Sequence, residues 1–352
     1  MKKLLALLLA LVMVLSFAAC NKAEEPVEEP VEEPVEEPTE EPTAATYKLG
    51  MGVSVSTDSA ADGNAQVDAT VAAVVVDADG KIVAAKLDAA QTKLNTAEFP
   101  EDLTTVDVRS KYTKGEDYNM KKYSEAVGEW YEEADFFCNY IIGKTGAEVA
   151  ALELTTREAD GYTVAADPDL YAGCSIQIGE FMTAVSKACA DEYAKEFTAD
   201  SFNLGLAVST DVTGSTAATA DAAGVAQLYS DFAAVVTDAN GAILADLVDA
   251  IQPKIAFDTT GALGEITFAG TKKELKEGYN MKAFRPDAIG EWYEQATFFE
   301  NFVVGKTGSD VAGLELTTRE ADGYTVAADA DLYAGCSIQI GTFMANIAAA
   351  AK

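Results

Sequence analysis

Hydrophobic and polar positions change their period along this chain, and the same succession of patterns occurs twice. Asn203 to Ser209 alternates apolar and polar residues, as a half-buried strand does. Runs rich in apolar and β-branched residues at 225–236 and 242–257 then flank an Asn-Gly turn, which predicts a hairpin. Residues 71–87 show the same arrangement around an Asp-Gly turn. Each half of the chain therefore begins with antiparallel strands.

The pattern after each hairpin changes to helical spacing. Thr271 to Glu277 predicts a short helix closed by Gly278, and Pro286 predicts the start of a longer one. A final alanine-rich helix is predicted at 181–189 and again at 343–350. The longer helix has apolar residues at three- and four-residue steps in both halves, at Val127, Trp130, Ala134, Phe137 and Ile141, and at Ile289, Trp292, Ala296, Phe299 and Val303. We read this stripe as core and predict an α+β fold, with an antiparallel sheet packed against helices in each repeat.

Long identical runs show that the two halves are a tandem duplication. Residues 152–167 and 314–329 both read LELTTREADGYTVAAD, and 170–179 and 332–341 both read LYAGCSIQIG. We assign residues 46–197 to one repeat domain and 198–352 to the other. Each repeat of about 155 residues is an ordinary size for a single domain.

The first 45 residues predict export and anchoring. Lys2 and Lys3 precede an apolar run from Leu4 to Val14, and residues 16–20 read SFAAC. This ending resembles the lipobox of bacterial lipoproteins, so residues 1–20 are expected to be a signal peptide and Cys20 the lipidated residue that binds the membrane. Residues 21–45 form a Glu/Pro-rich stalk, which we expect to be disordered and extended. The predicted location is the outer face of the cell membrane.

The charge and the lack of histidine exclude several classes of function. The chain carries a formal net charge of −33. Ten of its glutamates belong to the stalk, so the rest of the chain is strongly acidic as well. Nucleic-acid binding is not expected, because it requires lysine and arginine to displace phosphate counterions. The chain has no histidine, which removes His-based catalytic triads and most zinc sites.

The cysteines and isolated carboxylates suggest little chemistry. Cys174 and Cys336 are equivalent and lie in apolar runs, so we expect both to be buried. A disulfide between Cys138 and Cys189 stays open as an alternative. Glu129 and Glu291 are weak hydrolase candidates, because they stand beside a tryptophan on an expected exposed helix face without an acidic partner.

One duplicated motif points to a cofactor. Residues 169–177 read DLYAGCSIQ, and residues 331–339 repeat these letters. The motif resembles the Asp-x-x-Ser-Gly-Ala-Thr-x-Thr signature of covalent FMN-binding domains, in which a flavin transferase attaches FMN to the hydroxyl that ends the Ser-Gly-Ala-Thr core. The chain departs from that signature at Ala172, Cys174 and Gln177 and at their equivalents.

The resemblance implies a role for four positions in each repeat. The flavin-accepting hydroxyl would belong to Ser175 and Ser337. Glycine would allow close approach of the backbone, and a tyrosine would lie near the flavin ring. The other implied cofactor residues are Asp169, Tyr171 and Gly173 in the first repeat and Asp331, Tyr333 and Gly335 in the second.

Two functions follow as expectations. If FMN is attached, the chain would be an extracytoplasmic electron carrier with a redox partner, and the flavin would supply the chemistry. The alternative is a cofactor-free surface lipoprotein that binds a ligand or partner, with the duplication giving bivalency. Neither function makes the chain a substrate-converting enzyme.

Overall fold

The computed structural model describes residues 44–285 and 288–352. The predicted signal peptide, Cys20 and nearly all of the stalk lie outside the described residues. Ala44–Lys352 forms one compact unit of mixed helices and antiparallel sheets, so the α+β prediction is confirmed. In the described part of the chain, no helix is long and apolar enough to cross a membrane.

The first repeat contributes a four-stranded antiparallel sheet with the order β3-β2-β1-β6. Its last strand lies far along the chain and pairs with β1, so the assigned boundary at 197/198 falls inside β6. The strands are β1 (Ala45–Ser56), β2 (Asn64–Val76), β3 (Ile82–Asn95) and β6 (Lys195–Ala199).

The second repeat forms two three-stranded antiparallel sheets, with the orders β10-β9-β7 and β12-β11-β8. The runs predicted at 225–236 and 242–257 are each divided in two. The division occurs where Leu228 donates its backbone N–H to the carbonyl of Pro253, which has no N–H to return to a ladder. The strands are β7 (Asn203–Asp211), β8 (Gly224–Gln227), β9 (Tyr229–Thr237), β10 (Ile243–Ile251), β11 (Lys254–Phe257) and β12 (Leu263–Thr267).

Helices and one small hairpin follow the sheet in each repeat. In the first repeat they are α1 (Lys111–Lys114), α2 (Met120–Tyr123), α3 (Trp130–Tyr140), α4 (Gly146–Ala150), β4 (Leu154–Thr156), β5 (Thr163–Ala165), α5 (Pro168–Tyr171) and α6 (Gly179–Cys189). In the second they are α7 (Lys272–Leu275), α8 (Met281–Phe284), α9 (Trp292–Val303), α10 (Gly308–Ala312), β13 (Leu316–Thr318), β14 (Thr325–Ala327), α11 (Ala330–Gly335) and α12 (Gly341–Ala350).

Two predicted helix boundaries were wrong. The long helix of the second repeat begins at Trp292, where the Glu291 and Glu294 side chains form a capping box, and residues 288–291 before it are not helical. Pro286, the predicted start, lies outside the described residues. The short helix before it ends at Leu275 and not at Glu277. Lys276 follows with a φ of 49°, which ends the α-helical geometry two residues earlier than predicted.

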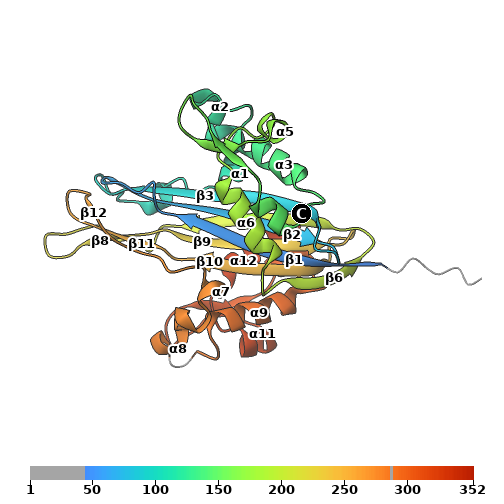
Figure 1. Cartoon of the computed structure of the whole chain (residues 1–352). Helices are drawn as coiled ribbons and strands as arrows, with labels where there is room; N and C mark the ends of the chain where they lie inside the picture. The colour runs from blue at the N-terminus through green and yellow to red at the C-terminus, as the bar shows by residue number, and fades with distance from the viewer. Residues whose placement is uncertain (1–43, 286–287) are drawn as a thin grey trace, which may run out of the picture. The chain divides into compact units, whose positions relative to one another are not determined.

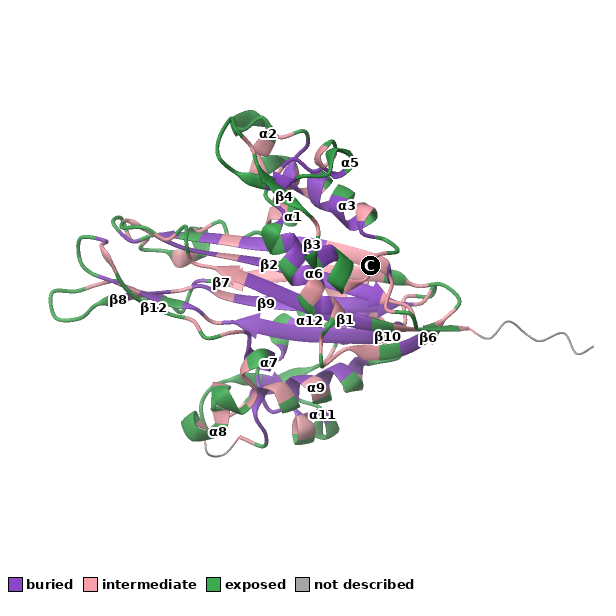
Figure 2. Ribbon diagram, viewed as in Figure 1, coloured by how far each residue is buried: buried purple, intermediate pink, exposed green. Residues whose placement is uncertain are grey.

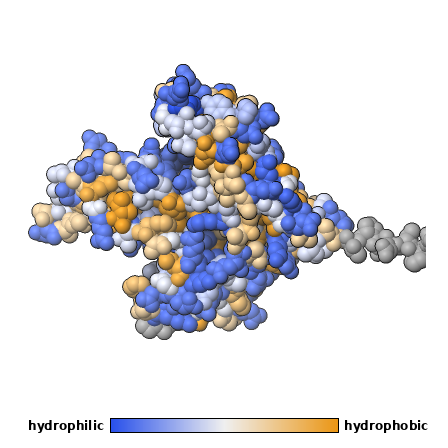
Figure 3. Space-filling model, viewed as in Figure 1, coloured by the Kyte–Doolittle hydropathy of each residue, from blue (hydrophilic) through white to orange (hydrophobic). Residues whose placement is uncertain are grey.

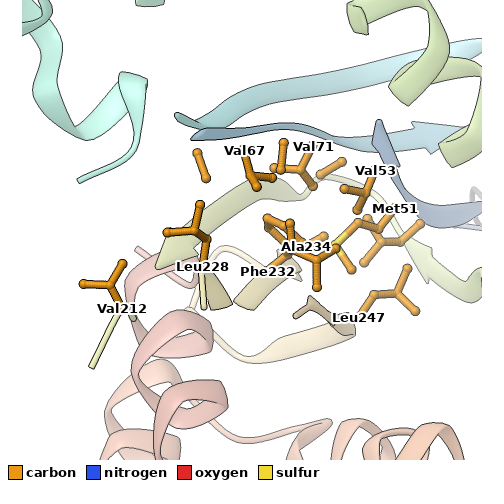
Figure 4. Packing of buried hydrophobic residues seen from close by; sticks show 14 of the residues in the cluster. Met51, Val53, Val67, Val71, Val212, Leu228, Phe232, Ala234 and Leu247 are labelled. Atoms are coloured by element: carbon orange, nitrogen blue, oxygen red, sulfur yellow. The ribbon is translucent and has the colours of Figure 1, made fainter. Parts of the chain in front are cut away.

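The layers are helices, sheet, sheet and helices (Figure 1). Val67 and Val71 on β2 pack toward Phe232 and Leu247 of the second repeat, so the sheet of the first repeat shares one core with β9 and β10 of the second (Figure 4). Alternate residues point the other way. Ala72 and its neighbours on the outer face lie under α3 and α6, and β9 and β10 are covered likewise by α9 and α12. Figure 2 shows these strands buried while the outer helices keep exposed faces.

A glycine in each sheet lets the closing helix approach closely. A Cβ on Gly50 would lie 2.0 Å from the carbonyl oxygen of Ala188 in α6. A Cβ on Gly205 would lie 1.8 Å from the carbonyl oxygen of Ala350 in α12. Glycine at these strand positions therefore sets the helix-to-sheet distance in both repeats.

Candidate functional site

The FMN-like motif lies between the small hairpin and the closing helix of each repeat. The short helices α5 and α11 carry its aspartate and tyrosine, and the side chains of Asp167 and Asp329 cap them. Asp169 and Asp331 are exposed, whereas Tyr171 and Tyr333 are half-buried. The predicted cofactor residues therefore lie together along one short segment in each repeat.

The Ser175 hydroxyl, predicted to accept FMN, lies in the core. The Ser175 side chain is 1% exposed, and its Oγ lies 3.2 Å from both carboxyl oxygens of Glu133. Its backbone N–H donates to Glu133 Oε2 at 2.6 Å, and the N–H of Ile176 donates to the same oxygen at 3.1 Å. The backbone N–H of Val127 donates to Ser175 Oγ at 3.2 Å. This hydroxyl is fully engaged with protein groups.

The second repeat holds Ser337 in the same way with a different partner. Gln295 occupies the position of Glu133, and its Oε1 accepts from the Ser337 N–H at 2.8 Å and from the Ser337 hydroxyl at 3.0 Å. The Gln295 amide then donates to the carbonyl of Gly290 at 2.8 Å. A buried polar group costs free energy unless it is hydrogen-bonded, and both serines meet that requirement internally.

The motif glycine admits an aromatic ring from the neighbouring helix. A Cβ on Gly173 would lie 2.3 Å from the ring of Phe136, and a Cβ on Gly335 would lie 2.3 Å from the ring of Phe298. Close approach at this glycine was predicted, and in the structure the approaching group is a phenylalanine of α3 or α9. In this conformation neither serine presents a free hydroxyl for ester formation, so we derive no flavin chemistry from the segment.

An arginine that the sequence analysis missed joins the hairpin to the motif. Arg157 binds both carboxyl oxygens of Asp160 and donates from Nη1 to the carbonyl of Ser175 at 2.8 Å. Arg319 makes the same contacts with Asp322 and Ser337, also at 2.8 Å to the carbonyl. The sequence contained a sign of this ion pair, because both identical runs place an aspartate three residues after an arginine.

A buried lysine with aromatic neighbours is the second constellation that sequence reasoning missed. Lys272 Nζ lies 4.5 Å from the ring centre of Tyr229, 4.8 Å from that of Tyr279 and 5.1 Å from that of Trp292. Burial lowers the pKa of Lys272 to about 8, although Asp231 and Asp249 oppose the shift. In the first repeat, Lys111 lies over the Tyr118 and Trp130 rings, at 5.2 Å and 5.6 Å.

Buried carboxyl groups accompany these lysines. Burial raises the pKa of Asp88 and of Asp249 to about 6, and that of Asp231 to about 7. Asp88 accepts the backbone N–H groups of Tyr112 and Ala89, and Asp249 accepts the equivalent pair. These groups sit between sheet and helices in both repeats, where they anchor α1 and α7 to the strands.

A charge cluster around Glu300 of the second repeat has no equivalent in the first. Lys273 Nζ lies 2.5 Å from Glu300 Oε1, and both side chains are almost completely buried. Lys195 reaches the other oxygen of Glu300 at 3.1 Å. Burial raises the pKa of nearby Asp246, and the carboxyl of Glu300 raises it further. The first repeat has Tyr112, Ala85 and Cys138 at the positions of Lys273, Asp246 and Glu300.

Glu129 and Glu291 are not on an exposed helix face. They are 5% and 8% exposed and begin α3 and α9 as part of capping boxes. Each also accepts a backbone N–H from the preceding helix, from Met120 and Met281, at 2.7 Å. That exposure prediction was wrong, and the contacts give both glutamates a positioning role.

The cysteines are free thiols in the described part of the chain, so the open Cys138–Cys189 disulfide is not formed. Cys174 and Cys336 are fully buried, as predicted. Among the described residues, no group of three or more Cys, Asp or Glu side chains is placed to hold a metal ion. A cavity of about 420 Å³ lies where the repeats meet, and an ion pair between Lys187 and Glu274, 2.8 Å long, forms beside it.

Comparison with known proteins adds no assignment. No protein-family model, curated protein or solved structure matches the chain.

Proposed function

We propose that this chain is a lipid-anchored extracytoplasmic protein that binds a ligand or partner through two equivalent surfaces, one on each repeat, without a covalent flavin. The first 45 residues support the location, through the signal-like run, Cys20 and the acidic stalk. The observation that carries the binding role is an exposed hairpin with the same sequence in both repeats.

Exposed positions usually differ more between related sequences than buried ones, and in this hairpin the opposite holds. Buried strand positions differ between the repeats, as Val71 and Phe232 do, although both pack in the shared core. Most residues of 152–167 and 314–329 are exposed, yet the two segments are identical. Packing does not require identity at exposed positions, whereas recognition of the same ligand does.

The flavin role has support from the motif alone. Covalent attachment would require the segment around Ser175 to open and the Glu133 contacts to break, because the hydroxyl is buried and bonded. Ser337 faces the same requirement with Gln295. Electron transfer through FMN therefore remains the second candidate, carried by the duplicated resemblance.

Intact mass and visible absorbance separate the two functions. The full-length protein, co-expressed with a flavin transferase and purified from the membrane fraction, is compared with Ser175→Ala and Ser337→Ala variants. We expect a colourless protein whose mass contains no FMN and does not change beyond the substitutions themselves. A mass gain of one or two FMN phosphodiesters, lost stepwise in the variants, would establish the electron carrier and contradict our proposal.

A further inference from the structure

Each repeat displays a tyrosine on a solvent-exposed hairpin. We define the hairpin surface as residues 154–163 in the first repeat and 316–325 in the second. Tyr162 is 52% exposed and Tyr324 is 45% exposed. The threonines of the hairpin strands are exposed as well, so each hairpin surface also displays hydroxyl groups. Figure 3 shows a largely hydrophilic surface over the outer helical layers, with small hydrophobic areas in it.

The tyrosine is held in place before any ligand arrives. The backbone N–H of Arg157 donates to the carbonyl of Tyr162 at 2.8 Å, which closes the turn, and Gly161 adopts a φ of 77° within it. The Arg157 guanidinium lies 5.8 Å from the Tyr162 ring centre and also binds Asp160 and the carbonyl of Ser175. The carbonyl of the buried Ser175 therefore holds Arg157, which in turn contacts the hairpin. A preorganised ring loses little conformational entropy on binding.

This support explains why the identity extends beyond the hairpin. From 152 to 179, the first repeat differs from residues 314–341 only where Pro168 replaces Ala330. The segment contains the exposed ring, the arginine that fixes it and the serine turn beneath. These parts are connected by hydrogen bonds, and the tyrosine is the part of this segment that we expect to contact a ligand.

Charge and shape indicate the kind of ligand. Residues 152–169 carry five carboxyl groups and one arginine, and 314–331 carry the same charges, so anionic polymers are repelled. The 420 Å³ cavity between the repeats and a second one beside α6 contain no hairpin residue, and the ring itself is exposed, so we treat it as an open platform rather than part of a pocket. An uncharged sugar ring can stack its apolar face on tyrosine while threonine hydroxyls bond to its own hydroxyls.

The duplication itself favours a polymer. The two hairpin surfaces belong to opposite helical layers, beside α5 in one and α11 in the other (Figure 1). Two equivalent sites gain avidity only from a ligand that offers the same unit repeatedly. Resting on the proposed binding function, we propose that Tyr162 and Tyr324 are stacking platforms for a neutral polysaccharide.

The two platforms differ in one respect. Arg285 lies 4.9 Å from the Tyr324 ring centre and pairs with Asp322, whereas the first repeat has Ser124 at that position. Arg319 also lies over the Tyr324 ring, as Arg157 does over that of Tyr162, so Tyr324 has two arginines over its ring where Tyr162 has one. Tyr162 is therefore the more accessible ring. We expect loss of Tyr162 to weaken binding more than loss of Tyr324.

Affinity electrophoresis tests the proposal with the full chain. Native gels contain dextran, soluble starch, xylan or mannan, and polygalacturonate serves as the anionic comparison. We expect retarded migration in at least one neutral gel and none in polygalacturonate. Tyr162→Ala should reduce the retardation more than Tyr324→Ala, and the double variant should abolish it. Tyr162→Phe keeps the ring, and Ile266→Ala removes an exposed apolar residue of β12, so both should migrate like the parent.

Three results would overturn the proposal: no retardation in any neutral gel, retardation only in polygalacturonate, or full retardation of the double variant. Circular dichroism of each variant shows whether it is folded, and the exposure of both tyrosines makes loss of the fold unexpected. The flavin mass measurement tests the binding function separately. A failed glycan test with no FMN would reject the ligand class while leaving the binding function in place.

Discussion

At the scale of single residues, the two repeats provide a natural substitution at a buried site. Glu133 and Gln295 are equivalent, and each accepts the N–H and hydroxyl of the motif serine. A carboxylate in one repeat and an amide in the other therefore accept the same hydrogen bonds from the motif serine. The sequence predicted that Cys174 and Cys336 are buried but missed Glu133, because a charged residue in an apolar stripe looks solvent-facing until its buried partners are known.

Substitution of Glu133 should follow this internal comparison. Glu133→Gln keeps an acceptor for Ser175 and should change the free energy of unfolding by less than about 1 kcal/mol. Glu133→Leu leaves the N–H groups of Ser175 and Ile176 without a partner in the core, which should cost about 2–4 kcal/mol. Urea denaturation followed by circular dichroism gives both values. Equal losses for the two variants would show that the acceptor does not hold this turn.

At the scale of elements, the hairpins and the closing helices were predictable because their periods are strong. The hairpins around Gly80 and Gly241 and the helices at 181–189 and 343–350 all occur. The break at Leu228 was not predictable, since it depends on a contact with Pro253 across the sheet. The polar layer between helices and strands was also missed, because neither Lys111 nor Lys272 is distinguished from a surface lysine by its neighbours in sequence.

This polar layer predicts an unusual pH dependence of stability. The pKa values of Asp88 and Asp249 are raised from 3.8 to about 6, and that of Asp231 to about 7. Between pH 4 and 7 the folded state therefore binds more protons than the unfolded state, so the free energy of unfolding falls as pH rises. Carboxyl groups with lowered pKa values, such as Asp160, titrate below this range. We expect a higher urea midpoint at pH 5 than at pH 7.5.

The double variant Asp88→Asn, Asp249→Asn is the matched test of that dependence. Asparagine keeps an acceptor oxygen for the bonded N–H groups but does not titrate, so the difference between pH 5 and pH 7.5 should shrink. A parent protein whose midpoint is unchanged or lower at pH 5 would show that these aspartates are not held in a raised-pKa environment.

At the scale of the whole molecule, the shared core joins the repeats into one body. Val71 and Phe232 come from different repeats and belong to the same buried cluster, and the Lys195–Glu300 ion pair crosses the boundary as well. The sequence predicted two repeats of domain size. It did not predict that their sheets face each other, because an apolar strand face does not reveal what will cover it. The arrangement leaves both helical layers, with their hairpin surfaces, on the outside.

Urea unfolding of single-tryptophan variants shows whether the two repeats unfold as one body. Each repeat has one tryptophan, so Trp292→Phe leaves Trp130 as a reporter of the first repeat, and Trp130→Phe leaves Trp292 for the second. If both repeats depend on one inter-sheet core, the fluorescence transition of each variant should coincide with its own circular dichroism transition in urea. Two separate transitions, with one tryptophan reporting the earlier and the other the later, would show independent domains and contradict the account.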